Sequence, residues 1–232
     1  MIKACIFDVF GTLVDWRASI AKEAQAILSP LDISLDWGAF ADAWRDQYEP
    51  AMEEVRSGRL PFSKLDVLHR RNLDVILGAY GLDQVDEATR CHLNLAWHRL
   101  DAWPDVASGL NLLRQKYVLA PCSNGNISLM VGLARRNGFV WDAVLGAEVA
   151  HAYKPMPVVY TSAAAAFDLT PEQTLMVAAH SSDLAAAAAA GLRTAFVARP
   201  DEQGPGLGEK VPGTPVDYSV KSILELAEIL CA

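Results

Sequence analysis

The chain has 232 residues and a formal net charge of −8 at pH 7. This acidic balance argues against a nucleic-acid partner, because backbone phosphates require a basic face. No apolar run approaches the roughly 20 residues that a membrane span requires, so no membrane association is expected. The four cysteines show no CxxC spacing and no signal-like segment precedes the first apolar run, which predicts a reduced, cytoplasmic protein.

The first predicted element is a β-strand over residues 2–9, an apolar run that is broken by Gly11. Asp8 stands at the end of this run. Open α/β sheets bind ligands beyond the carboxyl ends of their strands, so the Asp8 carboxylate is expected at the ligand-binding edge. A single carboxylate in this position is a candidate nucleophile.

A long helical segment follows the first strand. From residue 16 to residue 100, charged residues are interleaved with Ala, Leu, Trp and Ile, and turn signals occur at 29–30, 57–58 and 78–81. We interpret residues 15–100 as an inserted helical cap.

Strands and helices alternate after residue 101, which predicts βαβ units and a parallel sheet. The predicted strands are 117–122, 143–145, 174–178 and 194–197, and the predicted helices are 105–115, 127–137, 156–168 and 183–190. The glycine-rich segment 204–208 lacks the spacing of a dinucleotide-binding motif and is expected to be a surface loop. The predicted fold class is therefore α/β, with a Rossmann-like parallel-sheet core made of residues 1–14 and 101–232 and the inserted helical cap.

Polar side chains follow three of the later strands and are expected at the same edge as Asp8. Ser123 and Asn124 offer neutral hydrogen-bonding groups, although Ser-Asn-Gly is also an ordinary strand-to-helix turn. An ammonium such as Lys154 about 4 Å from Asp8 would favour the ionised carboxylate by on the order of 4 kcal/mol before desolvation. Asp183 could orient this lysine, activate a water molecule or cap the following helix.

Five short motifs occur in one order along the chain: DxFGTL at 8–13, WR at 44–45, SNG at 123–125, KPxxxxY at 154–160 and a turn that ends at Asp183. Each motif alone is weak. Together they span nearly the whole chain, and the set resembles the (S)-2-haloacid dehalogenases, which are the halide-releasing branch of the haloacid dehalogenase (HAD) superfamily.

The resemblance implies a role for each matching residue. Asp8 would be the nucleophile, and Thr12 and Lys154 would orient it and balance its charge. Arg45, a delocalised and weakly hydrated cation, would bind the departing halide together with Asn124. The remaining implied roles are substrate carboxylate binding by Ser123, support of Lys154 by Tyr160, and positioning or activation of water by Asp183. Phe62 would form an aromatic wall of the halide pocket or fill an ordinary place in the core.

The residue at position 10 favours release of halide over transfer of phosphate. Superfamily members that move phosphate usually carry a second Asp two residues after the first, which protonates the leaving oxygen, and this chain has Phe10 there. Those members also usually have an acidic Mg²⁺ ligand near positions 178 and 179, where this chain has Ala178 and Ala179. A halide needs no proton, so neither a metal nor another cofactor is predicted.

The turn before Asp183 departs from the family pattern. The family often has Ser and Asn where this chain has Ala178 and His180, and it often has Trp where this chain has Ser182. His180 could donate to a substrate oxygen, assist the attacking water or only fill space. The hydrogen bonding of the second half-reaction therefore stays open at this point.

The leading hypothesis is a hydrolase that converts short (S)-2-haloalkanoic acids, such as haloacetates and 2-halopropionates, into (R)-2-hydroxy acids through an aspartyl ester. One alternative is a Mg²⁺-dependent phosphatase or phosphonate hydrolase of the same superfamily, and another is a non-catalytic binding module on a HAD scaffold. The partner is then a small anionic 2-haloacid, and a cap rich in Trp, Leu and Met predicts a homodimer. The preferred halogen does not follow from the residues, because it depends on pocket volume.

Overall fold

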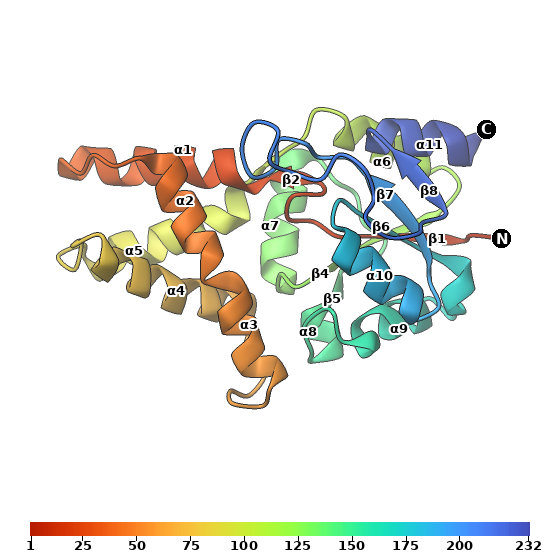
Figure 1. The fold of residues 1–232 in the computed structure, drawn as a ribbon, viewed down its shortest axis with the longest axis horizontal. Coiled ribbons are helices and arrows are strands. Elements are labelled where there is room, and N and C mark those ends of the chain that lie inside the picture. The colour runs from red at the N-terminus through yellow and green to blue at the C-terminus, as the bar shows by residue number, and fades with distance from the viewer.

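The computed structural model describes residues 1–232 and contains a six-stranded parallel sheet with helices on both faces (Figure 1). The strand order is β5-β4-β1-β6-β7-β8, so β1 lies in the interior of the sheet. The strands are β1 (Ala4–Phe7), β4 (Val118–Ser123), β5 (Leu145–Gly146), β6 (Thr174–Ala178), β7 (Arg193–Val197) and β8 (Tyr218–Val220). The α/β fold class predicted from the sequence is therefore confirmed.

The alternation of side chains along β1 divides the core between the two faces of the sheet. Cys5 and Phe7 belong to one buried cluster, and Ile6 belongs to the other. The first face packs against α6 (Val106–Leu113), α7 (Ile127–Asn137) and α11 (Ile223–Cys231), and the second against α9 (Pro157–Ala165) and α10 (Ser181–Ala189). Since every strand residue of β1 is fully buried, the strand holds its carboxyl end in a fixed position.

The segment between the first and second core strands is helical and stands beside the sheet (Figure 1). A short antiparallel pair, β2 (Val14–Asp15) with β3 (Asp101–Ala102), joins it to the core at both ends. Its helices are α1 (Trp16–Leu28), η1 (Ser29–Leu31), α2 (Trp37–Asp46), α3 (Tyr48–Arg56), α4 (Leu65–Ala79), α5 (Glu87–Asn94) and η2 (Leu95–Arg99). The Asp15 side chain accepts a hydrogen bond from the N–H of Ala18 and so caps α1 at the junction.

Helix and strand boundaries agree closely with the sequence in the middle of the chain. The helix α7 begins at Ile127 and ends at Asn137, followed by Gly138 with a φ of 70°, the left-handed conformation that glycine accommodates. The last strand and last helix, β8 and α11, were not predicted. The short helix α8 (Ala147–Ala150) and the 3-10 turn η3 (Pro171–Gln173) complete the fold. No helix has the length and apolar character needed to cross a membrane.

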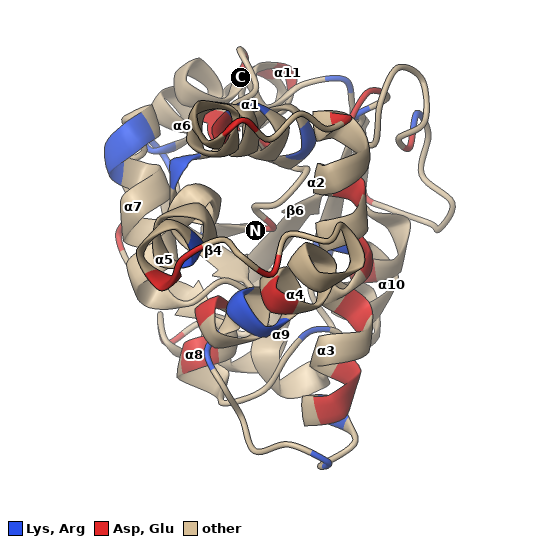
Figure 2. Ribbon diagram, turned by 90° about the vertical axis from the view of Figure 1, so that its left-hand side faces the viewer, with Lys and Arg blue, Asp and Glu red and all other residues tan.

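Acidic residues are prominent on the helical side of the molecule. Seen from that side, Asp and Glu residues recur along α3, which borders the pocket described below (Figure 2). Glu49 and Glu53 of this helix pair with Arg56, at N–O distances of 2.9 and 3.0 Å. Arg56 also donates to the backbone oxygen of Lys154 at 3.1 Å, so α3 is tied to the chain that carries the site lysine.

Candidate active site

Asp8 directly follows β1 and lies at the carboxyl edge of the sheet. Its backbone N–H donates to the oxygen of Val177 at 3.0 Å, which extends the pairing of β1 with β6 to this residue. Gly11 then turns the chain with a φ of 81°. The Asp8 side chain is only 9% exposed, yet it lines the pocket. Its carboxylate is therefore largely shielded from solvent but accessible to a small ligand.

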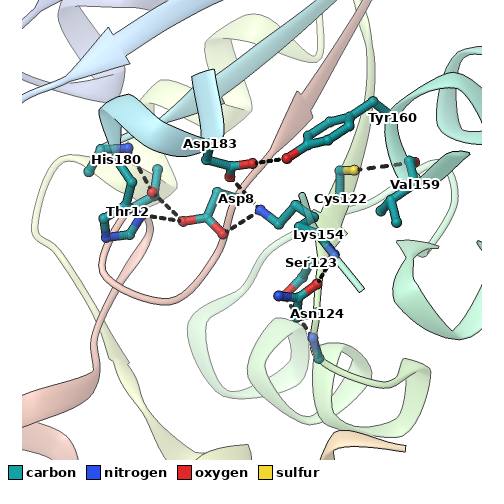
Figure 3. Close-up of polar contacts among 12 residues, drawn as sticks. Asp8, Thr12, Cys122, Ser123, Asn124, Lys154, Val159, Tyr160, His180 and Asp183 are labelled. Atoms are coloured by element: carbon teal, nitrogen blue, oxygen red, sulfur yellow. Dashed lines mark hydrogen bonds and ion pairs between the residues drawn. The ribbon is translucent and has the colours of Figure 1, made fainter. Parts of the chain in front are cut away.

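One oxygen of the Asp8 carboxylate contacts a lysine. Lys154 Nζ lies 2.9 Å from Asp8 Oδ1 and 2.5 Å from Asp183 Oδ2, and Figure 3 shows the ammonium between the two carboxylates. Burial alone would lower the pKa of Lys154, but Asp183 and Asp8 raise it well above its ordinary value. Lys154 is therefore a permanent cation at this site.

Tyr160 reaches the lysine through Asp183. Its hydroxyl donates to Asp183 Oδ1 at 2.5 Å, whereas the sequence predicted that it would support Lys154 (Figure 3). Burial and the neighbouring carboxylate raise the pKa of Tyr160 above its usual value, so the phenol keeps its proton. Asp183 thus accepts from two donors, which fixes its orientation.

The other oxygen of the Asp8 carboxylate contacts a hydroxyl and an imidazole. Thr12 Oγ1 donates to Asp8 Oδ2 at 2.7 Å and accepts from the N–H of Ala179 at 2.9 Å. His180 Nδ1 lies 3.2 Å from the same Asp8 oxygen. Burial disfavours ionised Asp8, but Lys154 and His180 outweigh it and hold the pKa of Asp8 far below its usual range. Asp8 is therefore a carboxylate at any physiological pH.

Glu202 is a site residue that the sequence did not indicate. Its carboxylate lies 2.9 Å from His180 Nε2 and accepts from Trp16 Nε1 at 3.0 Å, and the residue is 3% exposed. Burial would lower the pKa of His180, but hydrogen bonds to Asp8 and Glu202 raise it to about 10. Asp8, His180 and Glu202 therefore form a carboxylate–imidazolium–carboxylate chain.

The long loop between β7 and β8 is anchored so that Glu202 faces the site. Arg199 Nε donates to the backbone oxygen of Thr12 at 2.9 Å, and its other nitrogens pair with Asp105 at 2.8 and 2.9 Å. Further along the loop, Glu209 accepts from the N–H of Ser181 at 3.0 Å, next to His180. Residues on both flanks of the predicted surface loop 204–208, Glu202 and Glu209, therefore form one side of the active site.

Arg45 lies among aromatic rings, two of which line the pocket. Its guanidinium carbon is 3.9 Å from the centre of the Tyr48 ring, 5.4 Å from that of Trp16 and 6.0 Å from that of Phe10. The nitrogen Nη1 is buried and has no hydrogen-bond partner, and the side chain forms no ion pair. A buried cationic donor without a partner is suited to an anion, because leaving such a group unsatisfied is costly.

Ser123 is the last residue of β4 and Asn124 follows it, but only Asn124 lines the pocket. Asn124 Oδ1 accepts from the N–H of Lys154 at 2.8 Å, and its Nδ2 lies 3.2 Å from the sulfur of Met52. Ser123 is fully buried, and its oxygen accepts from the N–H of Gly125 at 3.0 Å. Ser123 therefore shapes the turn and does not line the pocket, where the sequence predicted that it would hold a carboxylate.

Phe62 does not form the aromatic wall that was predicted for it. Its ring packs 5.3 Å from that of His151 and 5.4 Å from that of Tyr153, because the segment after α3 runs against the loop that precedes Lys154. The aromatic residues that line the pocket are instead Phe10, Tyr48 and Tyr160. Tyr48 was missed, although it lies only three residues after Arg45, at the start of the next helix.

The pocket that contains these groups has a volume of ≈ 740 Å³. The residues that line it include Asp8, Phe10, Arg45, Asn124, Lys154 and His180. No group of three or more His, Cys, Asp or Glu residues is arranged to hold a metal ion. Burial raises the pKa of the nearby Cys122 thiol to about 12, so this cysteine is inert as a nucleophile.

Comparison with known proteins places this site in a family. Residues 2–191 match the model of the haloacid dehalogenase-like hydrolases. The chain is 28% identical over 234 residues to (S)-2-haloacid dehalogenase 1 of Pseudomonas sp. (strain CBS-3), covering 99% of this chain and 96% of the relative.

Two solved structures are more similar in sequence. The defluorinating L-2-haloacid dehalogenase Rha0230 has a TM-score of 0.97 and 40% identity, with 100% of this chain and 96% of that chain covered. The L-2-haloacid dehalogenase PA0810 has a TM-score of 0.95 and 43% identity, with 99% of each chain covered. The chain, with its buried Asp8 at the carboxyl end of β1, therefore belongs to the haloacid dehalogenase-like hydrolase family.

Proposed function

We propose that this protein hydrolyses the carbon–halogen bond of short (S)-2-haloalkanoic acids and releases a halide and an (R)-2-hydroxy acid. The observation that carries the proposal is the pairing of two groups in one pocket. Asp8 is a buried, permanently ionised carboxylate, and Arg45 Nη1 is a buried cationic donor with no partner. Relatives named as (S)-2-haloacid and L-2-haloacid dehalogenases at 28 to 43% identity support the same activity.

The first half-reaction is a displacement at saturated carbon. An oxygen of Asp8 attacks the carbon that bears the halogen, and the carbon–halogen bond breaks on the opposite side with its electron pair leaving on the halide. Arg45 receives the halide in an environment of aromatic rings, where a charge-assisted hydrogen bond is stronger than in water. Covalent catalysis thus divides one difficult substitution into two easier steps.

The surroundings of Asp8 fit a leaving group that needs no proton. Phe10 lines the pocket two residues after the nucleophile, so the chain offers no carboxylic acid there to protonate a leaving oxygen. Lys154 and Thr12 each donate a hydrogen bond to one oxygen of the Asp8 carboxylate, at 2.9 and 2.7 Å. These bonds orient the nucleophile and leave it ionised. Orientation of this kind lowers the entropic barrier of the displacement.

The second half-reaction releases the product. Water adds to the carbonyl carbon of the Asp8 ester, and the bond between that carbon and the ester oxygen breaks. The bond from oxygen to the substrate carbon stays intact, so the inversion of the first step is preserved. An (S)-2-halo acid therefore yields an (R)-2-hydroxy acid.

The test is halide release from both enantiomers of 2-chloropropionate and from fluoro-, chloro- and bromoacetate, with EDTA present throughout. We expect (S)-2-chloropropionate to give (R)-lactate and the (R)-enantiomer to react far more slowly. Racemic lactate or retention of configuration would refute the displacement by Asp8. Turnover of phosphomonoesters that EDTA abolishes and Mg²⁺ restores would establish a phosphatase instead.

A single turnover in ¹⁸O-labelled water locates the covalent step. The label should enter the Asp8 carboxylate and be absent from the first equivalent of hydroxy acid, since water attacks the ester carbonyl. Label in that first equivalent would mean that water attacks the substrate directly. Asp8→Asn should release no halide. If this variant keeps the biological phenotype while the wild type releases no halide from any haloacid tested, the protein is a binding module.

A further inference from the structure

We propose that His180 and Glu202 act together as the general base of ester hydrolysis, and that alkylation of Asp8 is what makes this base available. The inference rests on the proposed function and deepens it, because it assigns the second half-reaction to residues separate from those that hold the nucleophile. It gives Glu202, which lies in the loop between β7 and β8, a positioning role.

The geometry of the imidazole supports this assignment. His180 Nδ1 lies 3.2 Å from Asp8 Oδ2, so the imidazole contacts the carboxyl group whose carbon the water attacks in the second half-reaction. Nε2 lies 2.9 and 3.0 Å from the two oxygens of Glu202, so this carboxylate holds a proton on the far nitrogen. The near nitrogen is then the one that exchanges a proton with a molecule beside Asp8.

The environment of Glu202 is built around this contact. Trp16 Nε1 donates to Glu202 Oε1 at 3.0 Å, and a side-chain carbon at Gly11 would come within 2.0 Å of the same oxygen. The glycine in the turn after Asp8 therefore leaves room for a carboxylate from a distant part of the chain. A carboxylate that is 3% exposed is costly unless it is paired, and His180 is its only cationic partner.

The resting enzyme keeps the base blocked. Two carboxylates face the imidazole, Asp8 at Nδ1 and Glu202 at Nε2, and together they raise the pKa of His180 to about 10 against the effect of burial. Beyond Asp8 lie Lys154 and Asp183, and Glu209 approaches the neighbouring backbone. At neutral pH both ring nitrogens of His180 carry protons, so it cannot accept another from water.

Alkylation changes this balance. When Asp8 becomes an ester it loses its negative charge, and one of the two groups that stabilise the imidazolium disappears. The pKa of His180 falls, and Nδ1 releases its proton to solvent, which is the one proton produced for each halide. Nδ1 is then a free acceptor next to the ester carbonyl.

The proton transfers then balance over the cycle. Nδ1 takes a proton from the attacking water while the water oxygen bonds to the ester carbon. As the bond between that carbon and the ester oxygen breaks, Nδ1 returns the proton to the departing alkoxide and the 2-hydroxy acid forms. The new carboxylic acid of Asp8 gives its proton to His180, which restores the ionised pair.

Asp183 is the competing base, and its contacts argue against it. Both of its oxygens already accept short hydrogen bonds, from Lys154 at 2.5 Å and from Tyr160 at 2.5 Å. Neither oxygen is therefore left free of a protein donor, as a base that accepts a proton from water would be. His180 has no comparable fixed cation in contact with it.

The experiment compares His180→Gln and Glu202→Gln with the matched control Asp201→Asn, which alters an exposed neighbour in the same loop. After mixing with excess (S)-2-chloropropionate, both test variants should release about one halide per enzyme in a fast phase. Their steady-state turnover should then be on the order of 10²-fold slower than that of the wild type, and the loss should be larger for His180→Gln than for Glu202→Gln. Mass spectrometry of the quenched enzyme should show Asp8 bearing the ester. Asp201→Asn should behave like the wild type.

Two results would overturn the inference. If neither variant accumulates the ester and the fast phase itself slows, the pair acts on alkylation and not on hydrolysis. If ester breakdown in the wild type fails to accelerate with rising pH, or Glu202→Gln leaves it unchanged, the base lies elsewhere. Failure of the proposed function itself would look different, since the wild type would then release no halide.

Discussion

The two sides of the Asp8 carboxylate are built differently. On the side of Oδ1, Lys154 is held by Asp8 and Asp183, and Tyr160 completes the arrangement. On the side of Oδ2, His180 bridges to Glu202. The ammonium on the first side stays charged throughout the physiological range, whereas the imidazole on the second side owes its charge to Asp8 itself.

This difference separates two requirements of covalent catalysis. A nucleophile must be ionised before substrate arrives, and a permanent cation at 2.9 Å provides that without giving up a proton. A base for the second step must be available only after the ester has formed, and a histidine whose pKa depends on the same carboxylate responds to that event. The following changes test whether the two sides can be separated in this way.

The largest effect is expected for Lys154→Met, which removes the permanent cation. Asp8 and Asp183 would then lie buried without their shared ammonium, so the pKa of Asp8 should rise and alkylation should slow by roughly 10³-fold. Breaking a buried ion pair typically costs about 3 to 5 kcal/mol of folding free energy. Stopped-flow halide release and urea unfolding measure the two effects.

Lys64→Met is the control for this change. Lys64 forms a 2.7 Å ion pair with Glu148, but its side chain is 56% exposed, so its loss should alter neither measurement appreciably. If Lys154→Met alkylates Asp8 at a rate within tenfold of the wild type, the Oδ2 side alone suffices to activate the nucleophile, and the division between the two sides is wrong.

The two sides also differ in how far the sequence predicts them. Asp8, Asn124, Lys154 and Asp183 each follow a strand of the parallel sheet, and the topology of such a sheet brings strand ends to one edge. The strand pattern together with the order of the five motifs therefore predicted their convergence.

Glu202 was not predictable, because its position depends on contacts between distant segments. In the sequence it stands in Asp201-Glu202-Gln203, which resembles an exposed turn. Its burial depends on Arg199, which is anchored by Asp105 some ninety residues earlier in the chain. Phe62 was misplaced for a related reason, since the path of the segment after α3 is set by packing against the loop before Lys154.

An intermediate effect is expected for Gly11→Ala, which acts on the Oδ2 side. The new methyl would meet the Glu202 carboxylate and displace it from His180, so hydrolysis of the ester should slow more than alkylation. The positive φ of 81° adds backbone strain of about 1 to 3 kcal/mol for a residue other than glycine. Single-turnover halide release followed by quenched mass spectrometry separates the two steps.

Gly58→Ala controls for the backbone strain of this change. Gly58 has a φ of 76°, and nothing lies within 4 Å of the position that a side-chain carbon would take. It should lose comparable stability and keep the wild-type ratio of the two rates. Equal slowing of both steps in Gly11→Ala would show that the turn positions Asp8 and that Glu202 has no separate role.

The smallest effect is expected for Tyr160→Phe. This change removes one hydrogen bond to Asp183 and leaves the contact between Asp183 and Lys154 in place, so the loss should be about 1 to 1.5 kcal/mol, or roughly five- to tenfold in rate. The loss should fall on alkylation, because Tyr160 acts through the groups on the Oδ1 side. If ester hydrolysis slows instead, Asp183 takes part in the second step. His180 would then share the role of general base with Asp183.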